Sequence, residues 1–180
     1  FAPEKNNKLT NVYYGTKVKI QKGTIDGDVF GGGKGLASFS EAGRVKRNTE
    51  LTISDGLVKG NVYGGGSMGT VGTIDKSDQT NYNYKWKQND GNTANTAENN
   101  KITGENANTG ICHVTISGGT IGTGVAMSDD GTFANGNVYG AGKGLDDTWW
   151  CEKAMVFATN VNISAGTVIG TVYGGGEVTT

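Results

Sequence analysis

Residues 51–66 read LTISDGLVKGNVYGGG, and close variants of this stretch recur at three other places in the chain. The copies share an alternating apolar strand, a glycine turn, a second short apolar stretch and a closing cluster of glycines, with the consensus V-x-I-S-x-G-T-[IV]-x-G-x-V-Y-G-G-G. The four repeats lie near residues 18–33, 51–66, 114–142 and 161–176. Repetition of one short unit is typical of proteins in which each repeat covers the next.

The spacing of the repeats indicates where the chain tolerates extra length. The first repeat begins 33 residues before the second, whereas insertions near residues 75–109 and 123–135 lengthen the chain between the closing glycines of the second repeat and those of the third. Both insertions are rich in Asn, Thr, Asp and Gly, which is the composition of loops. Extra residues that bulge outward leave the register of a stack intact. We therefore expect residues 1–180 to form a single domain with two loop insertions.

Within each repeat the pattern is that of short strands rather than helices. Val18 and Ile20 alternate with Lys19, and this period of two places both apolar side chains on one face. A glycine such as Gly23 then turns the chain before the second strand, since glycine adopts backbone conformations that other residues avoid. The sequence predicts an all-β fold.

Stacking the repeats brings like residues into columns. The aromatic residues directly follow the valines, so they point the other way and form a column on the outer face. The predicted inner columns are Ile20, Ile53, Ile116 and Ile163, and Val29, Val62, Val138 and Val172; the aromatic column is Phe30, Tyr63, Tyr139 and Tyr173. This arrangement is a parallel β-solenoid, most simply a right-handed β-helix. A β-propeller is the alternative, because repeats of ~40–45 residues also form propeller blades.

Composition excludes several functional classes. The chain has 16 basic and 17 acidic residues, so it has no charge excess with which to hold nucleic acid. Its apolar runs are a few residues long, whereas a transmembrane helix needs about 20. We expect no nucleic-acid partner and no transmembrane segment.

The V-x-I-x-G-G-T-I-x-G-x-V-Y-G-G-G pattern resembles the repeats of large exported β-helix proteins of gut-commensal-type bacteria, which are loosely grouped as adhesin-like or surface-fibre proteins. The resemblance is carried by all four repeats. It implies an exported protein at the cell surface or in the extracellular space, and it transfers no catalytic residue. The expected function is that of a structural or adhesive surface segment which binds partners or glycans through its insertions. The alternative is a polysaccharide-binding or polysaccharide-cleaving β-helix protein.

The two ends of the sequence suggest further repeats. Residues 12–15, Val-Tyr-Tyr-Gly, resemble a degenerate V-Y-G of a preceding repeat, and residues 177–180 directly follow the fourth glycine cluster. We expect the chain to be a fragment of a longer array, whose partners are neighbouring solenoid coils or copies of itself stacked end to end into fibres.

Aromatic residues in and near the insertions are the candidate binding residues. Tyr82, Tyr84 and Trp86 alternate, so an extended segment would present all three on one face, and Trp149 offers a further ring. Exposed aromatic rings can stack on sugars or anchor a protein partner. The other interpretation is that these rings cover the flank of the stack.

Two acidic residues are the candidates for a metal site. The stretch AGKGLD at residues 141–146 partly matches a calcium-binding nonapeptide, and Asp146 and Asp147 could supply oxygen ligands. Tandem copies of the motif are missing, because Ala37 stands where the first repeat would need the aspartate. We therefore expect no cofactor, with calcium as the alternative.

Catalytic groups are not arranged as an enzyme requires. Polysaccharide cleavage commonly uses two carboxylates, and Asp26 and Asp28 share a face of the first repeat. However, Lys59 and Asn61 replace them in the second repeat, and His113 has no serine and carboxylate in view. We expect no enzymatic activity.

Two cysteines, Cys112 and Cys151, could pair in an exported chain. The alternative is that both are unpaired, small apolar residues packed against their neighbours. The sequence leaves both possibilities open.

Overall fold

A computed structural model describes residues 11–37, 41–75, 85–86, 109–124, 133–145 and 153–179. These residues form strands joined by turns, with no helix among them, as the sequence predicts for an all-β protein. Since the part of the chain that is described has no helix, it also has none long and apolar enough to cross a bilayer.

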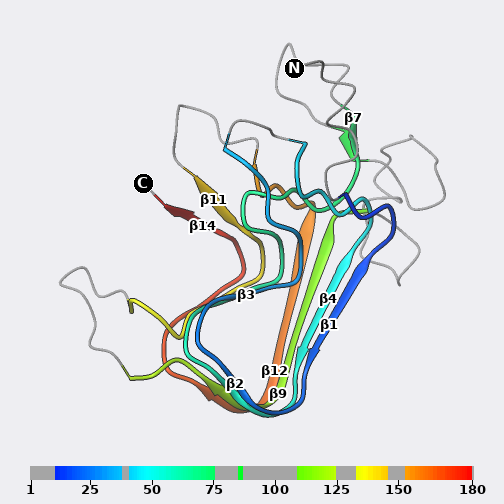
Figure 1. The fold of residues 1–180 in the computed structure, drawn as a ribbon. Coiled ribbons are helices and arrows are strands. Elements are labelled where there is room, and N and C mark those ends of the chain that lie inside the picture. Colours follow the sequence, from blue (N-terminus) through cyan, green and yellow to red (C-terminus); the bar gives the residue numbers. More distant parts are fainter. Residues whose placement is uncertain are drawn as a thin grey trace.

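The first two repeats each contain three short strands. They are β1 (Thr16–Ile20), β2 (Thr24–Ile25) and β3 (Val29–Phe30), then β4 (Thr49–Ile53), β5 (Leu57–Val58) and β6 (Val62–Tyr63). In the third and fourth repeats one long strand replaces the first two, because pairing continues around the bend (Figure 1). These strands are β9 (Ile111–Ile121), β10 (Val138–Tyr139) and β11 (Lys143–Leu145), then β12 (Ala158–Val168), β13 (Val172–Tyr173) and β14 (Glu177–Thr179).

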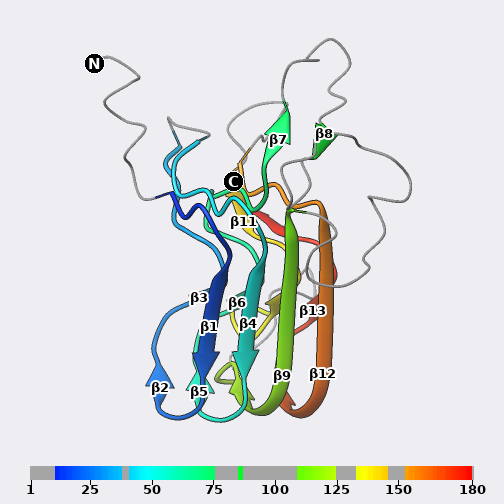
Figure 2. The same cartoon turned by 90° about the vertical axis from the view of Figure 1, so that its right-hand side faces the viewer.

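The strands pair in parallel between repeats rather than within them. One curled sheet joins β1, β4, β9 and β12 side by side and includes β5 and β2 (Figure 2), and a second has the order β13-β10-β6-β3. β11 and β14 form a third parallel pair. Parallel strands need long connections, and here the rest of each repeat supplies that connection.

The register places like residues over like residues. The isoleucine at the end of the first strand illustrates it: Ile20 pairs with Ile53, Ile53 with Ile116, and Ile116 with Ile163. In the second sheet Val29, Val62, Val138 and Val172 follow one another in the same way. The repeat of the sequence is therefore also the unit of strand pairing.

A glycine turns the chain after the first strand of each repeat. Gly23, Gly56, Gly119 and Gly166 have φ angles of 96°, 97°, 79° and 95°. This left-handed region of backbone space is costly for residues with a Cβ atom, so the sequence keeps glycine at this position.

The apolar core lies between the two sheets and runs through all four repeats. Its fully enclosed members belong to the middle of the stack: Ile53, Ile116, Val62 and Val138 have 0 % of their surface exposed. Its half-buried members belong to the two end repeats; they are Val18, Ile25, Val161 and Val168. The last members of the two predicted columns, Ile163 and Val172, are 38 % and 46 % exposed rather than inside. A repeat is thus fully enclosed only where another repeat lies on each side of it; in the first repeat Ile20 and Val29 are buried but keep 8 % and 6 % of their surface exposed.

Both insertions leave and rejoin the stack at closed necks. At the first, the backbone N–H of Thr73 donates to Oγ1 of Thr109 over 3.1 Å. At the second, the N–H of Thr123 donates to Oδ1 of Asn135 over 3.1 Å. Within the first insertion, β7 (Ile74–Asp75) pairs antiparallel with β8 (Lys85–Trp86). Because each neck is closed, insertions can vary without displacing the repeats.

The first glycine of each closing cluster directly follows the valine–aromatic strand of its repeat, and we call these residues the third-strand glycines; they are Gly31, Gly64, Gly140 and Gly174. They show how tightly the repeats stack. A Cβ atom at Gly64 would meet the carbonyl oxygen of Gly140 in the next repeat, whereas one at Gly174 in the fourth repeat meets nothing within 4 Å. We expect Gly64→Ala to lower the free energy of unfolding by about 1–3 kcal/mol, as overpacking does. The matched variant Gly174→Ala should stay within about 0.5 kcal/mol of the parent chain. Urea unfolding of dilute protein measures both, and equal losses would contradict this account of the stacking.

Candidate functional site

Most of the binding and metal candidates lie outside the described residues. These are Tyr82, Tyr84, Trp149, Asp146 and Asp147. Trp86 is placed in β8, where its backbone lies opposite Ile74. Within the described ranges no group of three or more His, Cys, Asp or Glu side chains is arranged to hold a metal ion.

The two carboxylates of the first repeat have separate structural partners. Asp26 forms an ion pair with Lys59 at 2.6 Å, whereas Oδ1 of Asp28 accepts the backbone N–H of Asn61 over 2.8 Å. The residues that replace them in the second repeat are therefore their partners. Each carboxylate holds the second repeat on the first.

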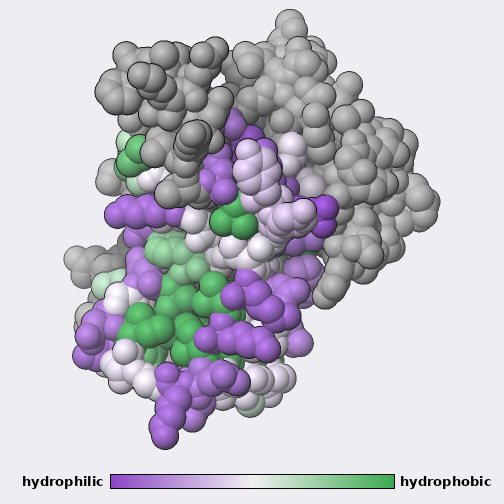
Figure 3. Space-filling model, turned by 45° about the vertical axis from the view of Figure 1, so that its right-hand side comes forward, coloured by the Kyte–Doolittle hydropathy of each residue, from purple (hydrophilic) through white to green (hydrophobic). Residues whose placement is uncertain are grey.

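The end surfaces of the stack carry the exposed large apolar residues of the described surface. Figure 3 views the first-repeat end obliquely and shows apolar side chains bordered by hydrophilic ones. Exposed large apolar residues gather at the two ends: Val12, Tyr13, Tyr14 and Leu36 in the first repeat, and Ile163, Val172 and Val178 in the fourth. At the fourth-repeat end a hollow of about 240 Å³ is lined by Met155, Glu177 and Val178, among others. Contiguous exposed apolar surface in a soluble protein marks a place of contact.

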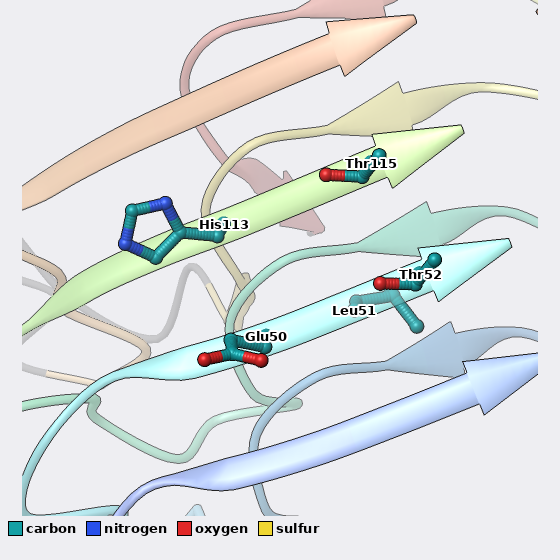
Figure 4. A pocket seen from close by; sticks show the side chains of 5 residues that line it. All are labelled: Glu50, Leu51, Thr52, His113 and Thr115. Atoms are coloured by element: carbon teal, nitrogen blue, oxygen red, sulfur yellow. The ribbon is translucent and has the colours of Figure 1, made fainter. Parts of the chain in front are cut away.

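A second hollow, of about 220 Å³, lies on the outer face of the first sheet, where β4 and β9 run side by side (Figure 4). Glu50, Thr52, His113 and Thr115 line it together with Leu51. Glu50 is directly opposite His113 in register, but its carboxylate is paired with Lys17 at 2.5 Å. The hollow offers two hydroxyl groups, an imidazole and a carboxylate that is paired with a lysine.

The aromatic column forms a continuous stack, but most of it is covered. Ring centroids of Phe30, Tyr63, Tyr139 and Tyr173 follow one another at 4.6, 4.9 and 4.9 Å, with planes inclined by 4–9°. These spacings equal the distance between paired strands, so strand pairing sets the stacking. Tyr63 is 0 % exposed and Tyr139 is 8 % exposed. The sequence predicts this column on the outer face, but its two middle rings are buried. The column therefore supports the stack from inside and does not present an exposed aromatic surface.

A charged cluster covers this aromatic column. The hydroxyl of Tyr63 donates to Glu177 of the fourth repeat. Nζ of Lys143 lies 3.3 Å from the same carboxylate, 4.0 Å from Asp28 and 5.7 Å from the centre of the Tyr63 ring. The cluster therefore links all four repeats, and its one lysine serves two carboxylates.

This environment shifts the ionisation of the tyrosines. Burial raises the pKa of Tyr63 far above its ordinary value of 10, and the hydrogen bond to Glu177 raises it further. Burial also raises the pKa of Tyr139 to about 12, with repulsion from Glu177 as the next cause. Both phenol groups therefore stay protonated at physiological pH.

A polar ladder at the third strand escaped the sequence prediction. Oδ1 of Asn61 accepts the N–H of Asn137 over 2.9 Å, and Oδ1 of Asn137 accepts the N–H of Thr171 over 2.9 Å. With Asp28 below Asn61, one side chain per repeat binds the backbone of the next. The signal was present in the sequence, because Asp or Asn precedes the valine in three of the four repeats.

A threonine column includes the buried cysteine. Thr16, Thr49 and Thr159 each donate a hydroxyl hydrogen bond to a third-strand glycine, with distances of 2.5, 2.6 and 2.7 Å to the carbonyl oxygens of Gly31, Gly64 and Gly174. Cys112 occupies this position in the third repeat, between Thr49 and Thr159. Cys112 is fully buried and its thiol is free, and Cys151, its candidate disulfide partner, lies outside the described residues. Burial raises the pKa of the Cys112 thiol to about 12.

Comparison of the chain with protein-family models, with curated proteins and with solved structures finds no match.

The raised pKa of Tyr139 predicts loss of stability in alkali. Its folded-state pKa of about 12 exceeds the ordinary value of 10, so the unfolded chain loses this proton first. The stabilisation is complete below pH 10 and is lost as the pH rises toward 12. Replacing Tyr139 by Phe should flatten this part of the curve of unfolding free energy against pH. Urea unfolding across this pH range measures both curves, and an unchanged slope in the phenylalanine variant would contradict the assignment.

The threonine column predicts that Cys112→Thr is tolerated. The new hydroxyl would face the carbonyl oxygen of Gly140, as its counterparts do in the other repeats, and a hydrogen bond of this kind contributes about 1 kcal/mol. We expect the variant to be at least as stable as the parent chain in urea unfolding, and Cys112→Ala to be less stable. A threonine variant weaker than the alanine variant would show that the thiol has another role.

Proposed function

We propose that the chain is a segment of a right-handed parallel β-helix, serving as the structural scaffold of an exported, adhesive surface protein that binds partners or glycans through its insertions. The observation that carries the proposal is the register: the isoleucine, valine and aromatic columns run from the first repeat to the fourth. The polar ladder has Asp or Asn in three repeats and reaches the backbone of the fourth, and the threonine column has Cys112 in the third repeat. Columns of this kind make a stiff, extended body.

The mode of strand pairing supports a β-helix rather than a β-propeller. A propeller blade joins strands of one repeat into an antiparallel sheet. Here the repeats are joined to one another by parallel pairs, and the described antiparallel strand pair lies in an insertion, between β7 and β8.

The use of the acidic residues supports a structural role over polysaccharide cleavage. Glu50 pairs with Lys17, Asp26 with Lys59, and Glu41 with Arg44. Asp55 caps the turn by accepting the N–H of Gly56, Asp28 acts in the polar ladder, and Glu177 acts in the charged cluster. A general acid and a nucleophile need carboxylates that face a substrate rather than a neighbouring repeat.

The closed necks support a display role for the insertions. Residues 76–108 can be replaced by a short Gly-Ser linker between Asp75 and Thr109, because Thr73 and Thr109 already hold the neck together. The matched control replaces residues 125–132 inside the second neck. We expect both variants to keep the far-ultraviolet circular dichroism and cooperative unfolding of the parent chain.

Binding should separate the two variants. On a glycan array and on mammalian cell surfaces, the intact chain and the control are expected to bind, while the variant without residues 76–108 loses at least tenfold in affinity. Release of oligosaccharides from plant or host polysaccharides by the intact chain would overturn the structural role. Unfolding on removal of the insertion would contradict the scaffold.

A further inference from the structure

The two end repeats present unpaired strand edges. Among the described strands, β12 pairs only with β9, β13 only with β10, and β14 only with β11. At the opposite end, β1 and β3 likewise pair on one side only, with β4 and β6. Each edge therefore presents backbone N–H and C=O groups of the kind that form hydrogen bonds between repeats in the middle of the stack.

The longest strand at the fourth-repeat edge, β12, carries none of the usual protection against pairing, whereas β13 and β14 are short and β14 begins with Glu177. Natural edge strands are blunted by charged residues, proline or short length. β12 has 11 residues, ATNVNISAGTV, without a charge or a proline. Its Ile163 is 38 % exposed, whereas the column mates Ile53 and Ile116 are 0 % exposed.

The glycines at this edge reserve space for another repeat. A Cβ atom on Gly31, Gly64 or Gly140 would meet the carbonyl oxygen of the equivalent glycine in the following repeat. Gly174 is the fourth member of this series, and a Cβ atom there meets nothing within 4 Å. A second series points the other way: a Cβ atom on Gly60 would meet Gly27 of the preceding repeat, whereas Gly27 itself faces open space.

We propose that the chain assembles head to tail, with the first repeat of a second copy seated on the fourth repeat in the register that joins repeats within the chain. The inference rests on the proposed scaffold and names its partner. Continuing the register pairs Ile163 with Ile20, Val172 with Val29 and Tyr173 with Phe30 of the incoming copy. Each column then runs on without interruption.

Charge complementarity favours a second copy as the occupant. Glu177 is the one charged residue in residues 155–179, while residues 16–34 hold four lysines and two aspartates. The shared register places Lys34 of the incoming copy beside Glu177, as Lys143 is within the chain. It also places Leu36, which is 50 % exposed, near the hollow lined by Met155 and Val178.

The junction joins unlike ends, so it does not close on itself. A head-to-tail contact without rotational closure generates an open filament rather than a dimer. The parent chain should therefore give masses that grow with concentration from the monomer mass of 18.7 kDa.

Two alanine variants each block one end. In Gly174→Ala the new methyl group would meet the carbonyl oxygen of Gly31 of the incoming copy, and in Gly27→Ala it would meet the last repeat of the preceding copy. Neither methyl group touches its own chain. By sedimentation or light scattering, each variant alone should be a monomer. Thr115→Ala, on the outer face away from both ends, should assemble as the parent chain does.

Mixing the two blocked variants gives the decisive measurement. One free edge remains on each, the first repeat of Gly174→Ala and the fourth repeat of Gly27→Ala, so the mixture should form a species of two chains and stop there. Backbone amides of β12 in the Gly27→Ala partner should become protected from hydrogen exchange in that mixture.

Three results would overturn the inference. One is a parent chain that stays monomeric at hundreds of micromolar. If the β12 amides of that monomer are already protected from hydrogen exchange, the chain covers its own edge. Another is self-association of Gly174→Ala alone, which would place the contact elsewhere. The third is a mixture that stays monomeric. If the parent chain is monomeric but binds glycans, the assembly proposal is wrong and the proposed function stands. The two proposals can therefore be tested separately.

Discussion

The structure depends on backbone hydrogen bonds that join one repeat to the next in parallel. These bonds fix the distance between repeats at the spacing of paired strands, and every other column in the molecule has to fit that distance. Aromatic rings 4.6–4.9 Å apart, amide side chains that reach the next backbone, and glycines without a Cβ atom all meet this condition. Side-chain chemistry that repeats at the same spacing therefore adds to the pairing rather than competing with it.

The repeat in the sequence predicted a large part of this arrangement. Apolar alternation and glycine turns indicated strands, and the alignment of repeats gave the register that joins Ile20, Ile53, Ile116 and Ile163. The covering of the aromatic column was not predictable, because it depends on Lys143 and Glu177, which lie outside the consensus. Alternation reports which side of a strand a residue occupies, and it does not report what later folds over that side.

The sequence was less informative about chemistry. Asp26 and Asp28 look like a pair of catalytic carboxylates until their partners in the second repeat are known. Likewise, only the three-dimensional structure shows that Cys112 takes a place in the threonine column. Residue types alone do not distinguish an acid that faces a substrate from one that faces its neighbour in a stack.

The direction of the inter-repeat hydrogen bonds has a mechanical consequence. The strands lie across the stack, so a force applied between its ends acts along these bonds, and every junction between repeats carries the same load. Detaching a repeat of 33 residues would release roughly 110 Å of extended chain. Under tension such a body lengthens by successive peeling, and a tether built from it would yield in steps and dissipate the load before it parts.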